Sequence, residues 1–218
     1  MYNIIEKKKI WFTFSGVLVA LSILALAIWG LRLGIDFTGG SLLEISYSQA
    51  RPEINQIEDT LNELEIQSLR VQPSNETEYL LRFENVDETT HQQILEGLGN
   101  IEIEGVENNV LTENRFESIG PIIGSELKAK AIESIVIVLI FIVAYIAYAF
   151  RKVSKPVASW KYGISAIIAL AHDILIVTGI FSVLGYLFNI EVDSLFVTAL
   201  LTILGFSVHD TIVTFDRT

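Results

Sequence analysis

Two histidine–aspartate pairs interrupt apolar stretches in the C-terminal part of the chain, His172–Asp173 and His209–Asp210. Imidazoles and carboxylates are the groups that a proton path needs, because histidine changes its charge near neutral pH and burial disfavours an ionised carboxylate. An ionisable group deep in a bilayer costs at least about 2.5–3.5 kcal/mol on insertion scales, so it usually faces other helices or a water path. All four residues are therefore candidate site residues. The alternative is that the pairs only hydrogen-bond neighbouring helices together.

The two pairs are predicted to lie at a similar depth. With a rise of 1.5 Å per residue, His172 lies roughly 15 Å from the start of its span at Tyr162, and Asp210 lies roughly 24 Å from Ser194. The two spans run in opposite directions, so both pairs fall in the middle to cytoplasmic half and could share a polar surface between helices. Hydroxyls at Ser207, Thr211 and Thr214 could carry a water chain beside Asp210. No spacing specific to a metal is present, and we expect neither a metal site nor a cofactor.

These groups must be held by membrane-spanning helices. The 218-residue chain is 51% apolar, and long stretches such as residues 10–31 carry no charge. Apolar runs near or above about 18 residues predict spans rather than soluble helices. The composition excludes an ordinary soluble enzyme and a nucleic-acid binder, and the absence of cysteine excludes a disulfide framework. We expect four spans, over residues 10–31, 130–150, 162–188 and 194–216.

The distribution of charge sets the expected orientation. Lys7, Lys8 and Lys9 place residues 1–9 in the cytoplasm by the positive-inside rule. The basic loop 151–161, with Arg151, Lys152, Lys155 and Lys161, then returns to the cytoplasm, and the link 189–193 lies outside. Residues 217–218 are cytoplasmic again. Because the chain stops where the fourth span exits, we expect it to be a fragment.

Residues 33–126 form an acidic module between the first two spans. They carry 19 acidic and 4 basic residues, a net charge of −15. Alternating residues 41–47 predict a strand, and Ile54, Ile57, Leu61 and Leu64 follow helical spacing. Strands near 67–72 and 78–84, a helix over 88–98 with Asp87 as its N-cap, and an extended stretch at 107–117 complete a ferredoxin-like β-α-β-β-α-β order.

Two features of this module leave alternatives open. Its acidity is read first as a solvated surface that keeps the module soluble, and second as a docking face for a basic or unfolded partner. The Gly39–Gly40 pair lies between the first span and the first strand and is either a joint or a simple turn.

Four sequence segments together resemble a known family in the right order. They are GIDFTGGSLLEI (34–45), SIGPIIGSELKAKAI (118–132), AHDILIVTGIFSVLG (171–185) and LLTILGFSVHDTIVTFDR (200–217). The chain is similar to the SecF members of the SecD/SecF family, within the resistance-nodulation-division superfamily.

The resemblance implies a membrane protein with an α-helical bundle of six spans, four of them visible here, and an extracytoplasmic α+β ferredoxin-like domain between spans 1 and 2. It implies a subunit that uses the proton-motive force, with no cofactor, to assist Sec-dependent export across the bacterial plasma membrane. Its partners would be a SecD-like subunit, the SecYEG translocon, the translocating preprotein and the lipid membrane, with no nucleic acid. Asp210 would be the proton carrier by position. An arginine thought to work with that aspartate would lie in the helices not seen here.

Two other functions stay in competition with this one. The first is an efflux transporter of the same superfamily, for which about 90 residues of outer module are too few to build a ligand cleft. The second is a structural membrane subunit without ion coupling.

Overall fold

The computed structural model describes residues 7–106, 108–151 and 159–216. The chain divides into two compact units. One, here the sheet unit, is Ile35–Lys128; the other, here the helical unit, comprises the described residues on either side of it. The predictions for Lys152, Lys155 and Arg217 concern residues outside the described ranges.

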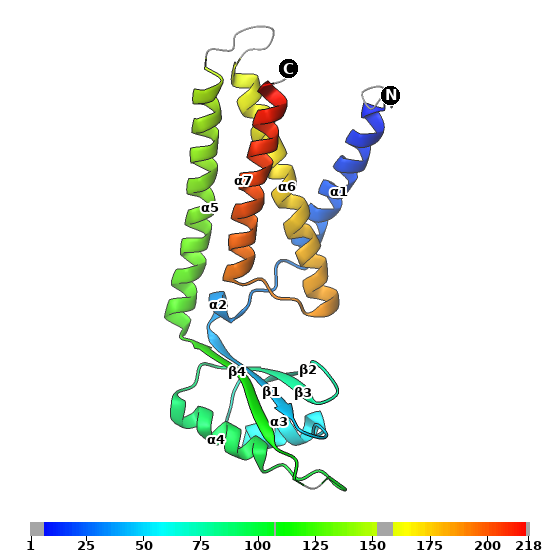
Figure 1. Cartoon of the computed structure of the whole chain (residues 1–218), viewed down its shortest axis with the longest axis vertical. Helices are drawn as coiled ribbons and strands as arrows, with labels where there is room; N and C mark the ends of the chain where they lie inside the picture. Colours follow the sequence, from blue (N-terminus) through cyan, green and yellow to red (C-terminus); the bar gives the residue numbers. More distant parts are fainter. Residues whose placement is uncertain (1–6, 107, 152–158, 217–218) are drawn as a thin grey trace. The chain divides into compact units, whose positions relative to one another are not determined.

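The sheet unit is built on one antiparallel sheet (Figure 1). Its strands lie in the order β2-β3-β1-β4, so β2 and β4 are the edge strands. Along the chain, strands and helices follow one another as α2, β1, α3, β2, β3, α4 and β4. Their bounds are α2 Ile35–Thr38, β1 Gly40–Tyr47, α3 Ile54–Glu63, β2 Arg70–Pro73, β3 Glu78–Phe83, α4 Glu88–Gly99 and β4 Leu111–Ile119.

One face of the sheet is apolar because inward residues recur every second position in β1 and β3. Leu43, Ile45 and Leu81 are fully buried there. Helices α3 and α4 cover this face with residues at helical spacing, among them Ile57, Leu61, Ile94 and Leu98, all with no exposed surface. Asp87 caps α4 as predicted: its Oδ1 accepts a hydrogen bond of 2.9 Å from the Thr90 backbone N–H.

Strands β2 and β4 both begin several residues later than the sequence pattern indicates. Ser68 has φ of +57° and Asn108 has φ of +55°, so each takes a left-handed conformation that extended backbone does not contain. Each of these residues lies in the turn before its strand, so β2 begins only at Arg70 and β4 only at Leu111. Asparagine and serine tolerate such turns through local hydrogen bonds, which alternation of apolar residues does not reveal.

Gly39 and Gly40 allow two backbones to approach closely. Their φ angles are +75° and +124°, and a Cβ on Gly39 would lie 2.7 Å from the Cα of Pro121. A Cβ on Gly124 would likewise lie 2.7 Å from the backbone N of Gly39. The pair therefore lets the chain that enters β1 cross the first turn of α5, which begins at Pro121.

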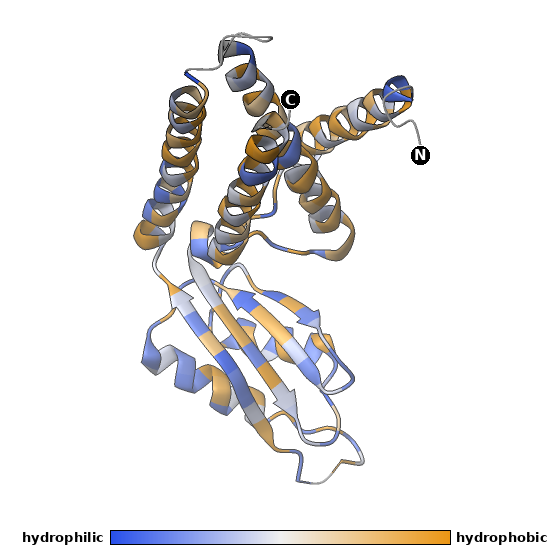
Figure 2. Cartoon of the chain, turned by 45° about the horizontal axis from the view of Figure 1, so that its top comes forward, coloured by the Kyte–Doolittle hydropathy of each residue, from blue (hydrophilic) through white to orange (hydrophobic). Residues whose placement is uncertain are grey.

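Four helices in the described residues are long and apolar enough to cross a membrane. They are α1 (Lys8–Ile28), α5 (Pro121–Ala149), α6 (Ser159–Phe188) and α7 (Ser194–Asp216). Figure 2 shows mostly apolar residues along each of them, whereas α4 carries a polar side. Large apolar side chains such as Phe141, Ile168 and Phe206 point outward, with 71%, 64% and 70% of their surface exposed. Such helices suit a lipid surrounding.

Helices α5, α6 and α7 share a small apolar core. Ile146 of α5 and Phe150, directly after α5, pack with Ala166 and Leu170 of α6 and with Leu204 of α7. The Phe150 ring stacks on that of Tyr162, and the Phe215 ring meets both edge to face, with centroids 4.9–5.7 Å apart.

Helices α1 and α6 pack in parallel with a constant offset of 157 residues. Ser15 contacts His172, the Ser182 hydroxyl donates to the Ala25 carbonyl, and Arg32 donates to Asn189. The same offset joins Ser22 to Gly179 and Trp29 to Tyr186. Contacts at residues 15, 22 and 29 recur every seven positions, the period of a left-handed helix pair.

Candidate functional site

A chain of polar contacts crosses three helices of the helical unit. The Ser15 hydroxyl of α1 lies 2.6 Å from His172 Nε2 on α6. His172 Nδ1 lies 2.9 Å from Asp173 Oδ1. The Ser207 hydroxyl of α7 donates a hydrogen bond of 2.5 Å to Asp173 Oδ2. The side chains of His172 and Asp173 are each 35% exposed. We call these four residues the polar chain.

The direction of each hydrogen bond in the polar chain depends on whether Asp173 is ionised. An ionised carboxylate only accepts hydrogen bonds, so Asp173 accepts one from the His172 Nδ1–H and one from the Ser207 hydroxyl. The neutral imidazole then accepts at Nε2 from the Ser15 hydroxyl. A proton added at Nε2 reverses the Ser15 bond and gives an imidazolium beside the carboxylate. The arrangement can therefore hold or release one proton without breaking its connectivity.

Close packing of α1 on α6 positions the histidine end of the polar chain. Seven residues beyond His172, a Cβ on Gly179 would lie 2.3 Å from the Cβ of Ser22. Only a glycine lets the two backbones approach in this way. Ser22 is 7% exposed, so no solvent separates the helices here. This approach places the Ser15 hydroxyl within hydrogen-bond distance of the imidazole.

The connectivity of hydroxyl, imidazole and carboxylate also occurs in nucleophilic hydrolases, where it needs donors for an oxyanion. Ser15 lies inside α1, well beyond the first turn that begins at Lys8. Backbone N–H groups inside a helix are bonded to carbonyls one turn earlier and cannot stabilise an oxyanion. The geometry of Ser15 therefore favours proton binding over acyl transfer.

The structure does not bring the two histidine–aspartate pairs together. His209 and Asp210 both lie on an exposed side of α7. The Asp210 backbone carbonyl accepts a bond of 2.8 Å from the Thr214 hydroxyl. Within the described ranges the Asp210 carboxylate has no hydrogen-bond partner. The link from α6 to α7 is instead Ser207, three residues before Asp210, which contacts Asp173.

Sequence reasoning named His172, Asp173 and Ser207 but missed Ser15, Ser22 and Gly179. The two serines are seven residues apart in the first span, and His172 and Gly179 are seven residues apart in the third. That shared spacing was the available signal, because polar and small residues that recur every seven positions mark a helix interface. In the described part of the chain, no group of three or more histidine, cysteine or acidic residues could hold a metal ion.

A second group of contacts lies where α1, α6 and α7 end or begin. The Gly34 N–H donates to the Val192 carbonyl at 2.9 Å, and the Val192 N–H donates to the Arg32 carbonyl at 2.7 Å. Arg32 Nε also lies 3.8 Å from the Glu191 carboxylate. Asp193 caps α7 by accepting from the Phe196 N–H at 2.8 Å. These contacts fix the ends of the helices that carry the polar chain.

Comparison with protein families gives two matches. Residues 102–218 match the family described as protein export membrane protein SecD/SecF, C-terminal. Residues 25–50, which include Gly39 and Gly40, match the SecD/SecF GG motif.

Similar proteins include translocase subunits from several bacteria. The protein translocase subunit SecF of Anaerolinea thermophila is 36% identical over 218 residues, which cover the whole chain and 68% of that relative. The SecF of Thermobaculum terrenum is 39% identical over 234 residues, covering the whole chain and 69% of that relative.

The fold is similar to a solved structure of SecDF, a translocon-associated membrane protein from Thermus thermophilus. The TM-score is 0.77 at 26% identity, over 99% of this chain and 27% of the solved chain. The present chain therefore spans about a quarter of that larger protein.

Proposed function

Because this chain belongs to the SecD/SecF family of protein-export membrane proteins, we propose that it is a SecF-type subunit that uses the proton-motive force to assist preprotein translocation. It works with a SecD-like subunit beside the SecYEG translocon, in the bacterial plasma membrane. The observation that carries the ion coupling is the polar chain, in which four hydrogen-bonding side chains connect three apolar helices. No bound cofactor is required, since the gradient supplies the energy.

The sheet unit is the extracytoplasmic, ferredoxin-like domain of this subunit. Its element order β1-α3-β2-β3-α4-β4 and strand order β2-β3-β1-β4 support that assignment. The N-terminus lies in the cytoplasm, as Lys7 to Lys9 indicate. The net charge of −15 over residues 33–126 suits the outer side of the membrane, because basic segments are the ones kept in the cytoplasm.

Asp210 is the proton carrier, and the polar chain is its neighbour. The Asp173–Ser207 bond fixes α7 one turn before Asp210. Asp210 itself is exposed among the described residues, so it is available to helices of a SecD-like partner or of the remaining subunit. Covered in that way, its charge is costly, and protonation removes the cost.

Protonation of Asp210 changes how α7 packs against the helices that cover it. Packed helix interfaces hold discrete arrangements, so a local change of charge can move whole elements. Proton flow would in this way drive cycles of movement in the extracytoplasmic domain, which holds a segment of the exported chain and prevents its return.

The test replaces Asp210 by Asn in the full-length subunit, assembled with its SecD-like partner in vesicles that carry the translocon. Stimulation of preprotein transport by an imposed proton gradient should be lost. Asp193→Asn is the matched control, because it makes the same change at the residue that caps the other end of α7 and asparagine caps helices equally well. If Asp210→Asn transports preprotein as the control does, ion coupling through Asp210 is wrong.

A further inference from the structure

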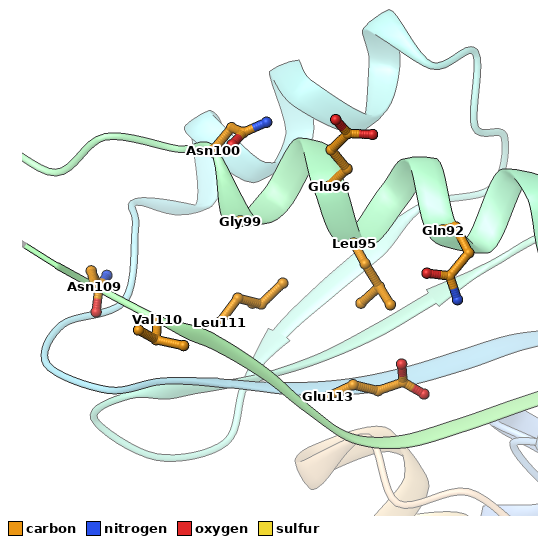
Figure 3. A pocket seen from close by; sticks show the side chains of 9 residues that line it. All are labelled: Gln92, Leu95, Glu96, Gly99, Asn100, Asn109, Val110, Leu111 and Glu113. Atoms are coloured by element: carbon orange, nitrogen blue, oxygen red, sulfur yellow. The ribbon is translucent and has the colours of Figure 1, made fainter.

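A groove in the sheet unit lies between α4 and the edge strand β4, with a volume of about 570 Å³ (Figure 3). One side is the α4 face formed by Gln92, Leu95 and Glu96, and the helix ends there at Gly99 and Asn100. The other side is the start of β4 and the residues before it: Asn109, Val110, Leu111 and Glu113. We call this feature the α4–β4 groove.

The α4–β4 groove combines an apolar floor with an acidic rim. Leu95 and Leu111 are partly buried against the core of the sheet unit, whereas Val110 is 60% exposed. Two carboxylates, Glu96 and Glu113, stand on opposite sides, and none of the described residues that line the groove is lysine or arginine. The end of α4 adds carbonyl groups and the negative end of the helix dipole. A ligand that carries apolar side chains next to positive charges would complement this apolar floor and acidic rim.

Strand β4 offers backbone groups along one side of the groove. It pairs with β1 on its inner edge only, because β4 ends the sheet. The Val110 carbonyl accepts from the Ser48 N–H at 3.0 Å and so points toward β1. Backbone direction alternates along a strand, so the N–H and C=O groups of Leu111 and Glu113 point away from β1. An extended polypeptide can add to such an edge as a further strand.

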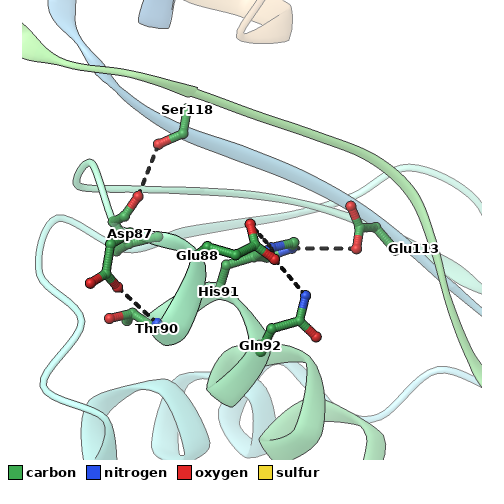
Figure 4. A network of polar contacts seen from close by, with 8 residues as sticks. Asp87, Glu88, Thr90, His91, Gln92, Glu113 and Ser118 are labelled. Carbon is green, nitrogen blue, oxygen red and sulfur yellow. Dashed lines mark hydrogen bonds and ion pairs between the residues drawn. The ribbon is translucent and has the colours of Figure 1, made fainter.

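The Glu113 side chain, which lines the groove, lies beside the ring of the buried His91 (Figure 4). His91 is 4% exposed, and its ring stacks on Phe116 with centroids 3.7 Å apart. Its Nε2 lies 3.3 Å from the Glu113 carboxylate, but the alignment leaves Nε2 without a hydrogen bond in the described structure. Burying an unsatisfied donor or acceptor is costly. A small shift of Glu113 as a ligand engages its other oxygen would remove that cost.

We propose that the α4–β4 groove binds an extended polypeptide segment in which an apolar residue is flanked by lysine or arginine, with the segment added to the edge of β4. The apolar side chain rests on Val110 and Leu111, and the cations pair with Glu96 and Glu113. That the segment comes from a preprotein leaving the translocon rests on the proposed function. The preference of the groove for such a segment depends only on its own residues.

The test measures binding of a short fluorescein-labelled peptide of alternating valine and lysine to the full chain in lipid nanodiscs, by fluorescence anisotropy. The double variant Glu96→Gln/Glu113→Gln should bind about five- to tenfold more weakly, as the loss of two exposed ion pairs implies. Val110→Lys should weaken binding without altering Glu113 and its buried neighbour. The control Glu58→Gln/Glu63→Gln removes the same charge from exposed positions of α3 and should bind as the unmodified chain does.

Two further peptides separate the parts of the proposal. Glutamate in place of lysine should abolish binding, and proline at alternate positions should do so as well, because proline cannot donate the strand hydrogen bonds. The proposal is overturned if the α3 control weakens binding as much as the groove variants, if the proline peptide binds unchanged, or if no peptide binds. It is also overturned if the groove variants alter self-association of the chain instead of peptide binding.

Failure of this proposal and failure of the proposed function give different results. Asp210→Asn should bind the peptide as the unmodified chain does, because Asp210 is not in the sheet unit. A photo-crosslinking residue at Val110 should then capture a translocating preprotein, whereas the same residue at Ile54 should not. Peptide binding with no crosslink would contradict the export role but keep the groove.

Discussion

Replacing Gly179 by alanine tests the contact on which the polar chain depends. The new Cβ would lie 2.3 Å from the Cβ and 2.5 Å from the Cα of Ser22. Ordinary carbon contacts begin near 3.4 Å, so α1 and α6 must move apart by about 1 Å. Because one of the close atoms is backbone, rotation of the serine side chain cannot relieve the clash. Overpacking of this kind destabilises by about 1–3 kcal/mol.

The measurement is unfolding of the full chain in mixed micelles with increasing SDS. Trp29 reports on this interface directly, because its ring stacks on Tyr186 with centroids 4.8 Å apart. With the other tryptophans replaced by phenylalanine, its fluorescence follows the separation of α1 from α6. The matched control is Gly163→Ala in the same helix, where a Cβ would meet nothing within 4 Å. Alanine is the better helix former, so this control should be neutral or stabilised by up to about 1 kcal/mol.

Unfolding of Gly179→Ala at the same SDS concentration as Gly163→Ala, or at a higher one, would show that this contact does not hold α1 against α6. Full recovery of stability when Ser22→Ala is added to Gly179→Ala would also contradict the predicted clash, because the Cα of residue 22 would still lie too close. Partial recovery is the expected result for that double variant.

Two further predictions concern the sheet unit. Hydrogen bonds from Thr90 hold the pKa of Asp87 below its usual value, so its stabilisation of the fold is complete above about pH 4 and is lost as the pH falls further. Asp87→Asn should keep the cap and flatten this part of the stability–pH curve. Asp87→Ala should lower the thermal midpoint near pH 7; a midpoint there equal to that of the unmodified protein would contradict the cap. The Tyr47 hydroxyl donates to the Leu98 carbonyl at 3.1 Å, and Tyr47→Phe should cost about 1 kcal/mol in urea unfolding. Burial raises the pKa of Tyr47, so stability should fall above about pH 10 in the unmodified protein and fall less in Tyr47→Phe; identical alkaline curves would refute this.

The elements of the fold were predictable where one physical signal dominated. Long charge-free runs indicated α1 and α7, and alternation over residues 41–47 indicated β1. The Asp87 cap followed from its position before an apolar helical pattern. The short helix α2, Ile35–Thr38, was missed, because four residues are too few to show a helical period.

The site was predicted only in part, because its members belong to different helices. The sequence indicated that His172 and Asp173 are polar groups in a span, but a single span does not reveal its neighbours. Ser15 belongs to the polar chain because α1 packs beside α6, a contact between residues 157 apart. Likewise, the sequence places Ser207 near Asp210 on the same helix. Packing of α7 against α6 instead directs the Ser207 hydroxyl to Asp173.

The parallel pairing of α1 with α6 has a consequence for how the protein is made. Ser15 and Ser22 enter the bilayer with α1, but the residues that contact them, His172 and Gly179, follow 157 positions later. At about 5–20 residues per second, a ribosome needs about 8–30 s to supply them. During that interval α1 must wait in lipid, or against an insertion factor, with its polar surface unpaired. Slowing or pausing translation before α6 should therefore expose the nascent protein to membrane quality control.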